Sequence, residues 1–375
     1  MDSTQKAFET TISSPRSYST QRNAEHINEI VAGVRWSFLT ETQASPSFTK
    51  IVDFFSFPAS YNHCGGADGL ALHVVQEQHA NNLQFFFHFF IKRVPDLVQL
   101  NMVRSLLAQV LLALENAQSL LRATHYDLHI GNVMLKDPAQ LDDDAWCFQR
   151  PNHRPSFYLD PNDLKGKQAV LIDFGRSRID HPYHPGDDRY AAYVELCGCP
   201  PSKKFDPFVD ARAFAHDFTR YILFPWTEHF VRIGSGSSST PRGSPFFAIE
   251  RECEQLLEEL YGVLEAMMGL RSFEGWNKNG DLSEARMGPV PRTLHQLLTY
   301  FPDGHTKVSR IRTNEFFFSR EERGFTPTEI LSMPFFGEYL REKPNHKVVA
   351  QPRSFRARSR DHRTEAAARD AKIRK

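Results

Sequence analysis

Two short segments carry most of what this chain reveals: His-Tyr-Asp-Leu-His-Ile-Gly-Asn at residues 125–132 and Ile-Asp-Phe-Gly at residues 172–175. The first contains Asp127 and, five positions later, Asn132, and the second contains Asp173. A carboxylate can accept a proton, and carboxylate and amide oxygens are ligands that Mg²⁺ accepts. The pattern therefore predicts a site for phosphoryl transfer, with Asp127 as the base and Asn132 and Asp173 as metal ligands.

The sequence around these segments predicts a framework for such a site. Between residues 97 and 122, apolar residues recur at helical spacing, which predicts a long buried helix that ends just before the loop. Short apolar runs at residues 133–135 and 169–172 predict two strands that flank the loop. Each aspartate would therefore lie beside a strand that packs on a buried helix.

The sequence of residues 109–135 resembles the haspin-type branch of the protein kinases and the kinase-like proteins of large DNA viruses. Those proteins also combine Asp-Leu-His with Gly-Asn in this loop, and a long stretch precedes their metal-binding Asp. Here 46 positions separate Asp127 from Asp173, and residues 157–167 look like the hairpin that haspin-type proteins insert there. The resemblance is specific in the loop, in Asp-Phe-Gly and in the helix before them.

The resemblance implies an α+β, two-lobed protein-kinase-like fold with a reduced N-terminal lobe and a mainly helical C-terminal lobe. The implied parts are a small lobe at 1–79, a large lobe at 80–340 with inserts near 137–168 and 233–245, and a basic disordered tail at 341–375. The implied function is transfer of the ATP γ-phosphate, with Mg²⁺, to a Ser or Thr hydroxyl of a protein substrate.

Two other functions stay open. Aminoglycoside and choline phosphotransferases share the Asp-Leu-His style of loop, so the substrate could be a small molecule. The second alternative is a pseudokinase that binds nucleotide or protein without catalysis, because no Gly-x-Gly-x-x-Gly precedes the first predicted helix. That phosphate-covering loop is expected to be absent, or to be encoded before Met1.

The lysine–glutamate ion pair of kinases has few candidates here. Lys6 is the only lysine before the first predicted helix, which spans residues 24–39. Glu25 lies 19 positions after Lys6, a separation similar to that in kinases, and Glu29 is an equally good partner. The apolar residues on one side of this helix are Ile27, Ile30, Val31, Val34 and Phe38.

The adenine-binding hinge of kinases also has a counterpart. Residues 70–76 alternate in apolar character, which predicts a strand. The resemblance places Gln76 at the back of the nucleotide pocket, with the Glu77 carbonyl and the His79 N–H group facing adenine.

Three further residues carry expectations about catalysis and regulation. Tyr126 replaces the Arg that in many kinases pairs with a phosphate, so activity should not require phosphorylation of residues 176–205. His129 replaces the loop lysine and is predicted to donate a hydrogen bond to phosphate or substrate, unless it is a structural histidine bonded to a carboxylate. Asp210 is either a buried acid that braces the loop backbone or an exposed helix N-cap.

Composition favours a globular protein. With 375 residues, 41% of them hydrophobic, and 31 Phe, the chain can bury the core of one two-lobed unit or two ordinary domains. No uninterrupted apolar stretch is long enough to cross a bilayer, so no membrane contact is expected. Five cysteines without framework spacing predict reduced thiols, not a zinc site, in an intracellular protein of the cytoplasm or nucleus.

The net charge is zero but unevenly distributed. Residues 341–375 hold twelve Lys or Arg against four Asp or Glu. Because residues 353–375 contain almost no large apolar side chains, the segment is predicted to be a disordered or partly helical tail. It would either contact nucleic acid or chromatin, or serve only as a solvated tail.

Overall fold

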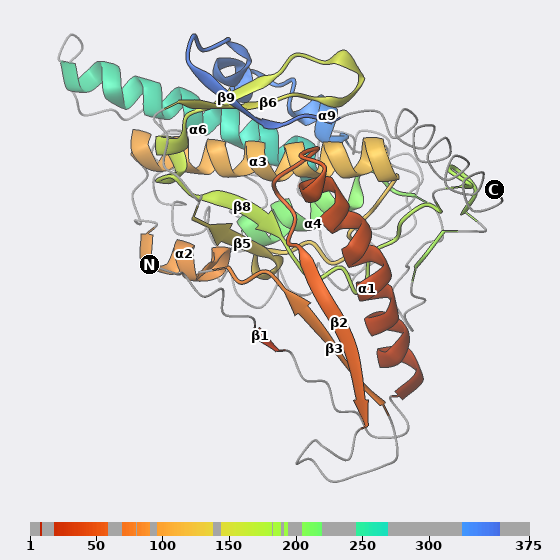
Figure 1. Cartoon of the computed structure of the whole chain (residues 1–375). Coiled ribbons are helices and arrows are strands. Elements are labelled where there is room, and N and C mark those ends of the chain that lie inside the picture. The colour runs from red at the N-terminus through yellow and green to blue at the C-terminus, as the bar shows by residue number, and fades with distance from the viewer. Residues whose placement is uncertain are drawn as a thin grey trace, which may run out of the picture.

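The computed structural model describes residues 8–9, 19–58, 70–79, 81–90, 96–137, 144–181, 183–188, 191–193, 205–219, 245–268 and 325–352. Within these ranges, helices and strands combine in a mixed α+β arrangement, which confirms the predicted class. Figure 1 shows a long helix, α3 (Leu97–Leu121), at the centre, with strands on both sides of it. Lys6 and residues 233–244 of the insert predicted at 233–245 lie outside the described residues.

The first sheet is antiparallel, with strand order β1-β3-β2. Its strands are β1 (Phe8–Glu9), β2 (Ile51–Pro58) and β3 (Leu70–Gln76), so the strand predicted at 70–76 is confirmed. Helix α1 (Ser19–Glu41) lies beside β2 in Figure 1. At Gly33 an added Cβ would lie 2.9 Å from Ile51 Cγ1, so the absence of a side chain at residue 33 lets helix and strand approach closely.

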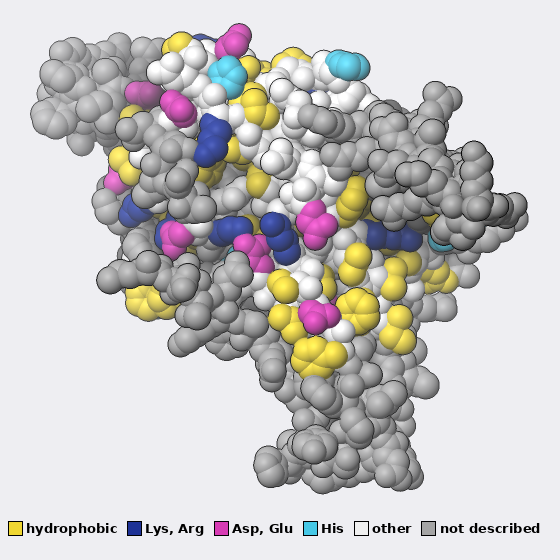
Figure 2. All heavy atoms as spheres, viewed as in Figure 1, with side chains coloured by type: hydrophobic (Ala, Val, Ile, Leu, Met, Phe, Trp, Pro, Cys, Tyr) yellow, Lys and Arg dark blue, Asp and Glu magenta, His cyan; other side chains and the backbone are white. Residues whose placement is uncertain are grey.

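Helix α1 buries a different side from the one where its aliphatic residues gather. The buried residues include Ala32, Trp36 and Leu39, and the exposed ones include Ile27, Val31 and Val34. Figure 2 shows exposed hydrophobic side chains over α1 and β2. The inward side is selected by aromatic packing, because Trp36 stacks on Phe174 with ring centroids 5.0 Å apart and meets Phe48 edge-on at 4.9 Å.

Helix α3 is the core of the remaining structure. The Asp96 side chain caps its start by accepting a hydrogen bond from the Gln99 N–H group, and Arg122 ends it in a left-handed conformation. By length and composition alone, α3 is apolar enough to cross a membrane, although polar residues interrupt its apolar stretch. Yet 83% of its most apolar window is buried inside the protein, as in the core helix of a soluble protein.

The second sheet, with strand order β4-β5-β8, packs against α3. Its strands are β4 (Asn81–Asn82), β5 (Val133–Lys136) and β8 (Gln168–Leu171), the last two being the strands predicted beside the loop. The buried Gln109 side chain fastens α3 to β8, because its oxygen accepts a hydrogen bond from the Ala169 N–H group at 2.7 Å.

The third sheet lies on the opposite side of α3 in Figure 1 and has strand order β7-β6-β9. Its strands are β6 (Ala145–Phe148), β7 (Phe157–Leu159) and β9 (His346–Ala350). The other helices are α2 (Leu83–Phe90), α4 (Val209–Phe218), α6 (Pro245–Met268) and α9 (Pro327–Ile330). Short 3₁₀ helices are η2 (Ile130–Asn132), η3 (Pro151–His153), η4 (Pro161–Leu164) and η9 (Pro334–Leu340).

This sheet corrects two sequence-based expectations. The hairpin expected at 157–167 instead pairs β6 with β7, so it begins earlier, and residues 161–164 form η4. The tail expected to be disordered from residue 341 contains β9, which pairs in parallel with β6 and buries Ala350 completely. The apolar run Val348-Val349-Ala350 explains this, because a short β-prone run gains burial and hydrogen bonds beside an existing strand.

A buried ionic cluster joins this sheet to α3 and α9. The Glu115 side chain on α3 is 1% exposed and accepts two hydrogen bonds from Arg150, at 2.7 and 2.8 Å. The same carboxylate accepts hydrogen bonds from Arg154 at 2.9 Å and from the Thr328 hydroxyl at 2.7 Å. One carboxylate on the central helix therefore holds a loop after β6 and the first turn of α9.

Candidate functional site

Strand pairing brings the two sequence segments together. Strands β5 and β8 are antiparallel, with Val133 opposite Leu171, so the start of β5 and the end of β8 meet at one edge. Asn132 immediately precedes β5, and its carbonyl accepts a hydrogen bond from the Ile172 N–H group at 3.1 Å. Asp173 therefore leaves the sheet at the edge where Asn132 enters it.

Buried side chains hold the start of the loop at 125–132 in place through hydrogen bonds. The His125 side chain is completely buried, and its Nε2 atom donates a hydrogen bond to the Ile172 carbonyl at 2.9 Å. Asp210 on α4 is also completely buried and accepts hydrogen bonds from the N–H groups of His125 and Tyr126, at 2.7 and 2.8 Å. Of the two interpretations of Asp210, the structure supports the buried brace.

Burial also changes the acidity of this brace. Desolvation raises the pKa of Asp210 to about 6, although His125 and the two backbone N–H groups act in the opposite direction. The buried carboxylate is held in place by backbone hydrogen bonds to both of its oxygens.

Replacing this brace is expected to destabilise the loop. Asp210→Ala would leave the buried N–H group of His125 and the part-buried N–H group of Tyr126 without this acceptor, at about 1–3 kcal/mol each, so we expect a loss of about 2–6 kcal/mol in the free energy of unfolding. Urea unfolding measures it, beside Asp160→Ala, which removes an exposed cap of η4 and should cost about 1 kcal/mol. Equal losses in the two variants would show that Asp210 braces nothing.

Asp127 and Asn132 differ in burial and in hydrogen bonding. The Asn132 side chain is almost completely buried, and its amide nitrogen donates a hydrogen bond to the Asp127 carbonyl at 2.9 Å. This bond turns the amide oxygen, the atom that a cation binds, away from the loop backbone. The Asp127 carboxylate is 22% exposed, and Arg176 Nη1 lies 3.4 Å from its Oδ1 atom.

The Asp-Phe-Gly segment forms a sharp turn that exposes Asp173 and buries the next residue. Asp173 has a φ of 63°, in the left-handed region that non-glycine residues seldom adopt, and Tyr126, next to Asp127, has a φ of 62°. Phe174 is buried against Trp36. Such backbone strain costs about 1–3 kcal/mol at each residue and is concentrated at functional sites.

Helix α1 reaches the site through its first half. Asn28 is 5% exposed, and its side-chain nitrogen donates hydrogen bonds to the carbonyls of Gly175 and Ser177, at 3.0 and 2.7 Å. One position later, burial and electrostatic repulsion by Asp173 raise the pKa of Glu29 to about 7. The structure therefore brings Glu29 to Asp173, whereas the side chain of Glu25 lies outside the described part of the chain.

Residues 77–79 connect the first sheet to the second. The Glu77 N–H group bonds to the Lys50 carbonyl, and its carboxylate pairs with Lys136 on β5. His79 Nε2 lies 2.9 Å from the Thr49 hydroxyl, and burial lowers the pKa of this histidine. These contacts fix the segment beside the strand whose start carries Asn132. The position of the two backbone groups toward adenine stays a prediction.

His129 is occupied in a structural contact. Its Nδ1 atom accepts a hydrogen bond from the Gly131 N–H group at 3.0 Å and so caps η2. A Cβ added at Gly131 would lie 2.8 Å from His129 Cε1, so this contact requires glycine. The arrangement favours the structural interpretation of His129, with a backbone partner in place of the expected carboxylate.

Sequence reasoning missed two residues of the site. No periodicity or motif distinguishes Asn28, which acts through backbone carbonyls 147 and 149 positions away. Arg176 follows Asp-Phe-Gly directly, and this position was the only available signal for its contact with Asp127.

The donor set suits magnesium better than a metal held by protein ligands alone. Among the described residues, no group of three or more His, Cys, Asp or Glu could hold a metal ion, and Cys147 and Cys253 are free thiols. Mg²⁺ typically takes one or two carboxylates and fills its shell with water and phosphate oxygens, so Asp173 with the Asn132 amide fits it.

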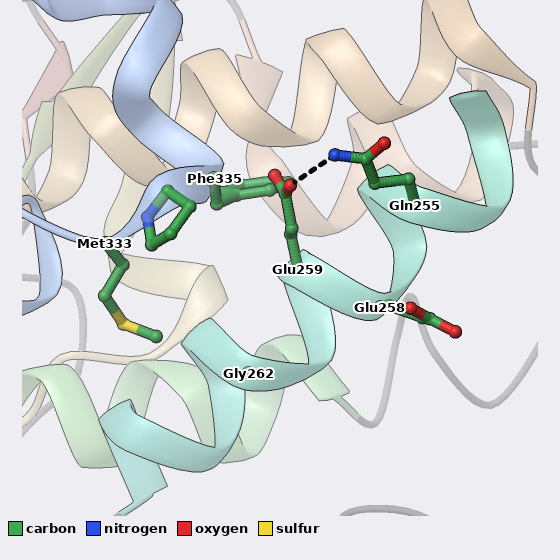
Figure 3. A pocket seen from close by; sticks show the side chains of 7 residues that line it. Gln255, Glu258, Glu259, Gly262, Met333 and Phe335 are labelled. Atoms are coloured by element: carbon green, nitrogen blue, oxygen red, sulfur yellow. Dashed lines mark hydrogen bonds between the residues drawn. The ribbon is translucent and has the colours of Figure 1, made fainter.

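A pocket elsewhere contains none of these residues. It lies between α6 and η9, lined by Gln255, Glu258, Glu259, Gly262, Met333, Pro334 and Phe335, and Figure 3 shows these side chains. Comparisons with models of protein families and with curated proteins give no match to this chain.

Proposed function

We propose that this chain is an ATP-dependent phosphotransferase with a two-lobed protein-kinase-like fold, and that its substrate is a protein Ser or Thr hydroxyl. The observation that carries the proposal is the joint placement of Asp127, Asn132 and Asp173. They occupy one loop and one strand end at the same edge of a sheet, on a frame held by the buried Asp210. Surface residues that happened to match a motif would not need such a frame.

The order of the elements supports two lobes. The first sheet with α1 would be the reduced N-terminal lobe at 1–79, and β1 lies next to β3, the strand that leads to residues 77–79. Lys6 would pair with Glu29. The helices and the other two sheets would form the C-terminal lobe at 80–340, extended by β9.

Each residue then has a chemical task. The Asp127 carboxylate accepts the proton of the attacking hydroxyl and orients that hydroxyl toward the γ-phosphorus. The oxygens of Asn132 and Asp173 would hold Mg²⁺, which would neutralise phosphate charge when bound. The backbone of Glu77 and His79 binds adenine. The same proposal includes protein substrates and a cytoplasmic or nuclear location. It also includes a nucleic-acid contact of the basic residues after 352.

The substrate class is tested by competition between acceptors. Purified protein with labelled ATP and Mg²⁺ is offered a Ser/Thr peptide library and, separately, aminoglycosides and choline. We expect label in peptides. If label appears only in the small compounds, the proposed substrate class is wrong and the proposed mechanism stands. If calorimetry shows ATP binding but no phosphate is transferred, the chain is a pseudokinase.

A further inference from the structure

The side chain of Arg176 places a positive charge beside Asp127. Its Nη1 atom lies 3.4 Å from Asp127 Oδ1, and the two side chains are 44% and 22% exposed. Within the described ranges, no other ion pair involves Asp127. Resting on the proposed function, we propose that Arg176 binds the γ-phosphate of ATP and leaves Asp127 when it does so.

The backbone at Arg176 is fixed while its side chain is free to turn. Asn28 bonds to the carbonyls on both sides of it, at Gly175 and Ser177, and Phe174 is anchored in the aromatic stack with Trp36. Gly175 and Ser177 are buried, whereas Arg176 is exposed. The starting point of the side chain is thereby set beside Asp127, and its guanidinium group can exchange partners without movement of the chain.

The neighbouring arginines Arg178 and Arg122 are committed to other partners. Arg178 is completely buried and pairs with Asp180 and Asp188, at 2.5 and 2.6 Å. Arg122 pairs with Asp180 at 2.9 Å. His129 accepts a hydrogen bond through Nδ1, so that atom cannot donate to phosphate.

The pair with Asp127 is weak enough to be exchanged. A partly exposed ion pair with one contact at 3.4 Å contributes little to stability. A phosphate group offers more oxygens and more charge than a carboxylate, and guanidinium donates to it through two parallel hydrogen bonds. The nucleotide would therefore draw Arg176 away from Asp127 and leave that carboxylate able to accept a proton.

The reaction then balances as follows. The substrate oxygen forms a bond to the γ-phosphorus as the bond from this phosphorus to the β–γ bridging oxygen breaks. ADP leaves with the bonding electrons, and the hydroxyl proton passes to Asp127. Arg176 faces the charge on the transferred phosphoryl oxygens, the position in which a cation lowers the barrier most.

Comparison of ATP with ADP isolates this contact. Calorimetry with Mg²⁺ is carried out on the wild type, Arg176→Ala, Arg176→Lys and the control Arg341→Ala, an exposed arginine after η9. We expect Arg176→Ala to weaken ATP binding about tenfold or more, because a charge-assisted hydrogen bond is lost, and to leave ADP binding nearly unchanged. Arg176→Lys should lie between, and millimolar guanidinium should partly restore ATP binding and phosphate transfer to the alanine variant.

The outcomes separate this inference from the proposed function. If the wild type binds ATP and transfers phosphate, but Arg176→Ala keeps the wild-type ratio of ATP to ADP affinity, the inference alone is wrong. Equal loss of both nucleotides in a variant that melts at the wild-type temperature would also overturn it, because the contact would not be with the γ-phosphate. A wild type that binds neither nucleotide overturns the proposed function and the inference together.

Discussion

Asp127→Ala is expected to lower phosphate transfer by about a hundredfold or more, as loss of a general base does. The affinity for Mg²⁺ and ATP should stay nearly unchanged, because the groups assigned to nucleotide binding are the backbone at 77–79, Asn132 and Asp173. The Asn132 amide bonds to the backbone carbonyl of Asp127, not to its carboxylate, so the alanine variant keeps that bond.

Calorimetric binding and labelled-phosphate transfer, measured on the same preparation, check this expectation. Asp137→Ala is a suitable control, because Asp137 pairs with Lys167 at the surface beyond β5 and has no role in the site. Unchanged transfer in Asp127→Ala would remove Asp127 from the chemical step. Loss of ATP binding would instead mean that its carboxylate positions the nucleotide.

Glu115→Ala should be among the most destabilising single substitutions in the chain. It would leave the Arg150 guanidinium, whose side chain is 3% exposed, without its counter-charge, at a cost of about 3–5 kcal/mol. Arg150 also packs over the Phe157 ring at 5.1 Å, so it cannot easily turn toward water. The anchor of α9 through Thr328 would be lost in the same step.

Urea unfolding of two further variants makes this prediction specific. The surface pair of Asp137 and Lys167 should contribute only about 0–1 kcal/mol, so Asp137→Ala sets the scale for an exposed pair. Replacing both partners, with Glu115→Leu and Arg150→Met, should recover much of the loss, because a buried pair can be exchanged for apolar packing. If Glu115→Ala were as stable as Asp137→Ala, the account of this cluster would be contradicted.

The parts of the fold that were predictable from sequence are those with strong local patterns. Helix α3 and strands β3, β5 and β8 carry clear helical or strand signals, and they occur where these signals place them. Thr326 and Glu329 form the capping box that their spacing indicates at α9. Local pattern suffices in these cases because burial on one side and capping act within a few residues.

The remaining features depend on contacts between distant segments. The choice between Glu25 and Glu29 could not be made from sequence, because four positions are about one helical turn and both residues face the same way. The stacking of Trp36 on Phe174 decides which face of α1 is buried. The pairing of β9 with β6 connects residues about 200 positions apart, so the tail appeared to be wholly disordered.

The central claim is that Asp173 helps to hold the magnesium through which this chain transfers phosphate. The most direct test is transfer of labelled γ-phosphate to the peptide library by the wild type and by Asp173→Asn, across a magnesium titration. We predict magnesium-dependent transfer by the wild type and a loss of about a hundredfold in the variant, partly offset at high magnesium, because an amide holds the cation more weakly than a carboxylate. Wild-type transfer rates in Asp173→Asn, or no magnesium-dependent transfer by the wild type to any acceptor, would contradict the claim.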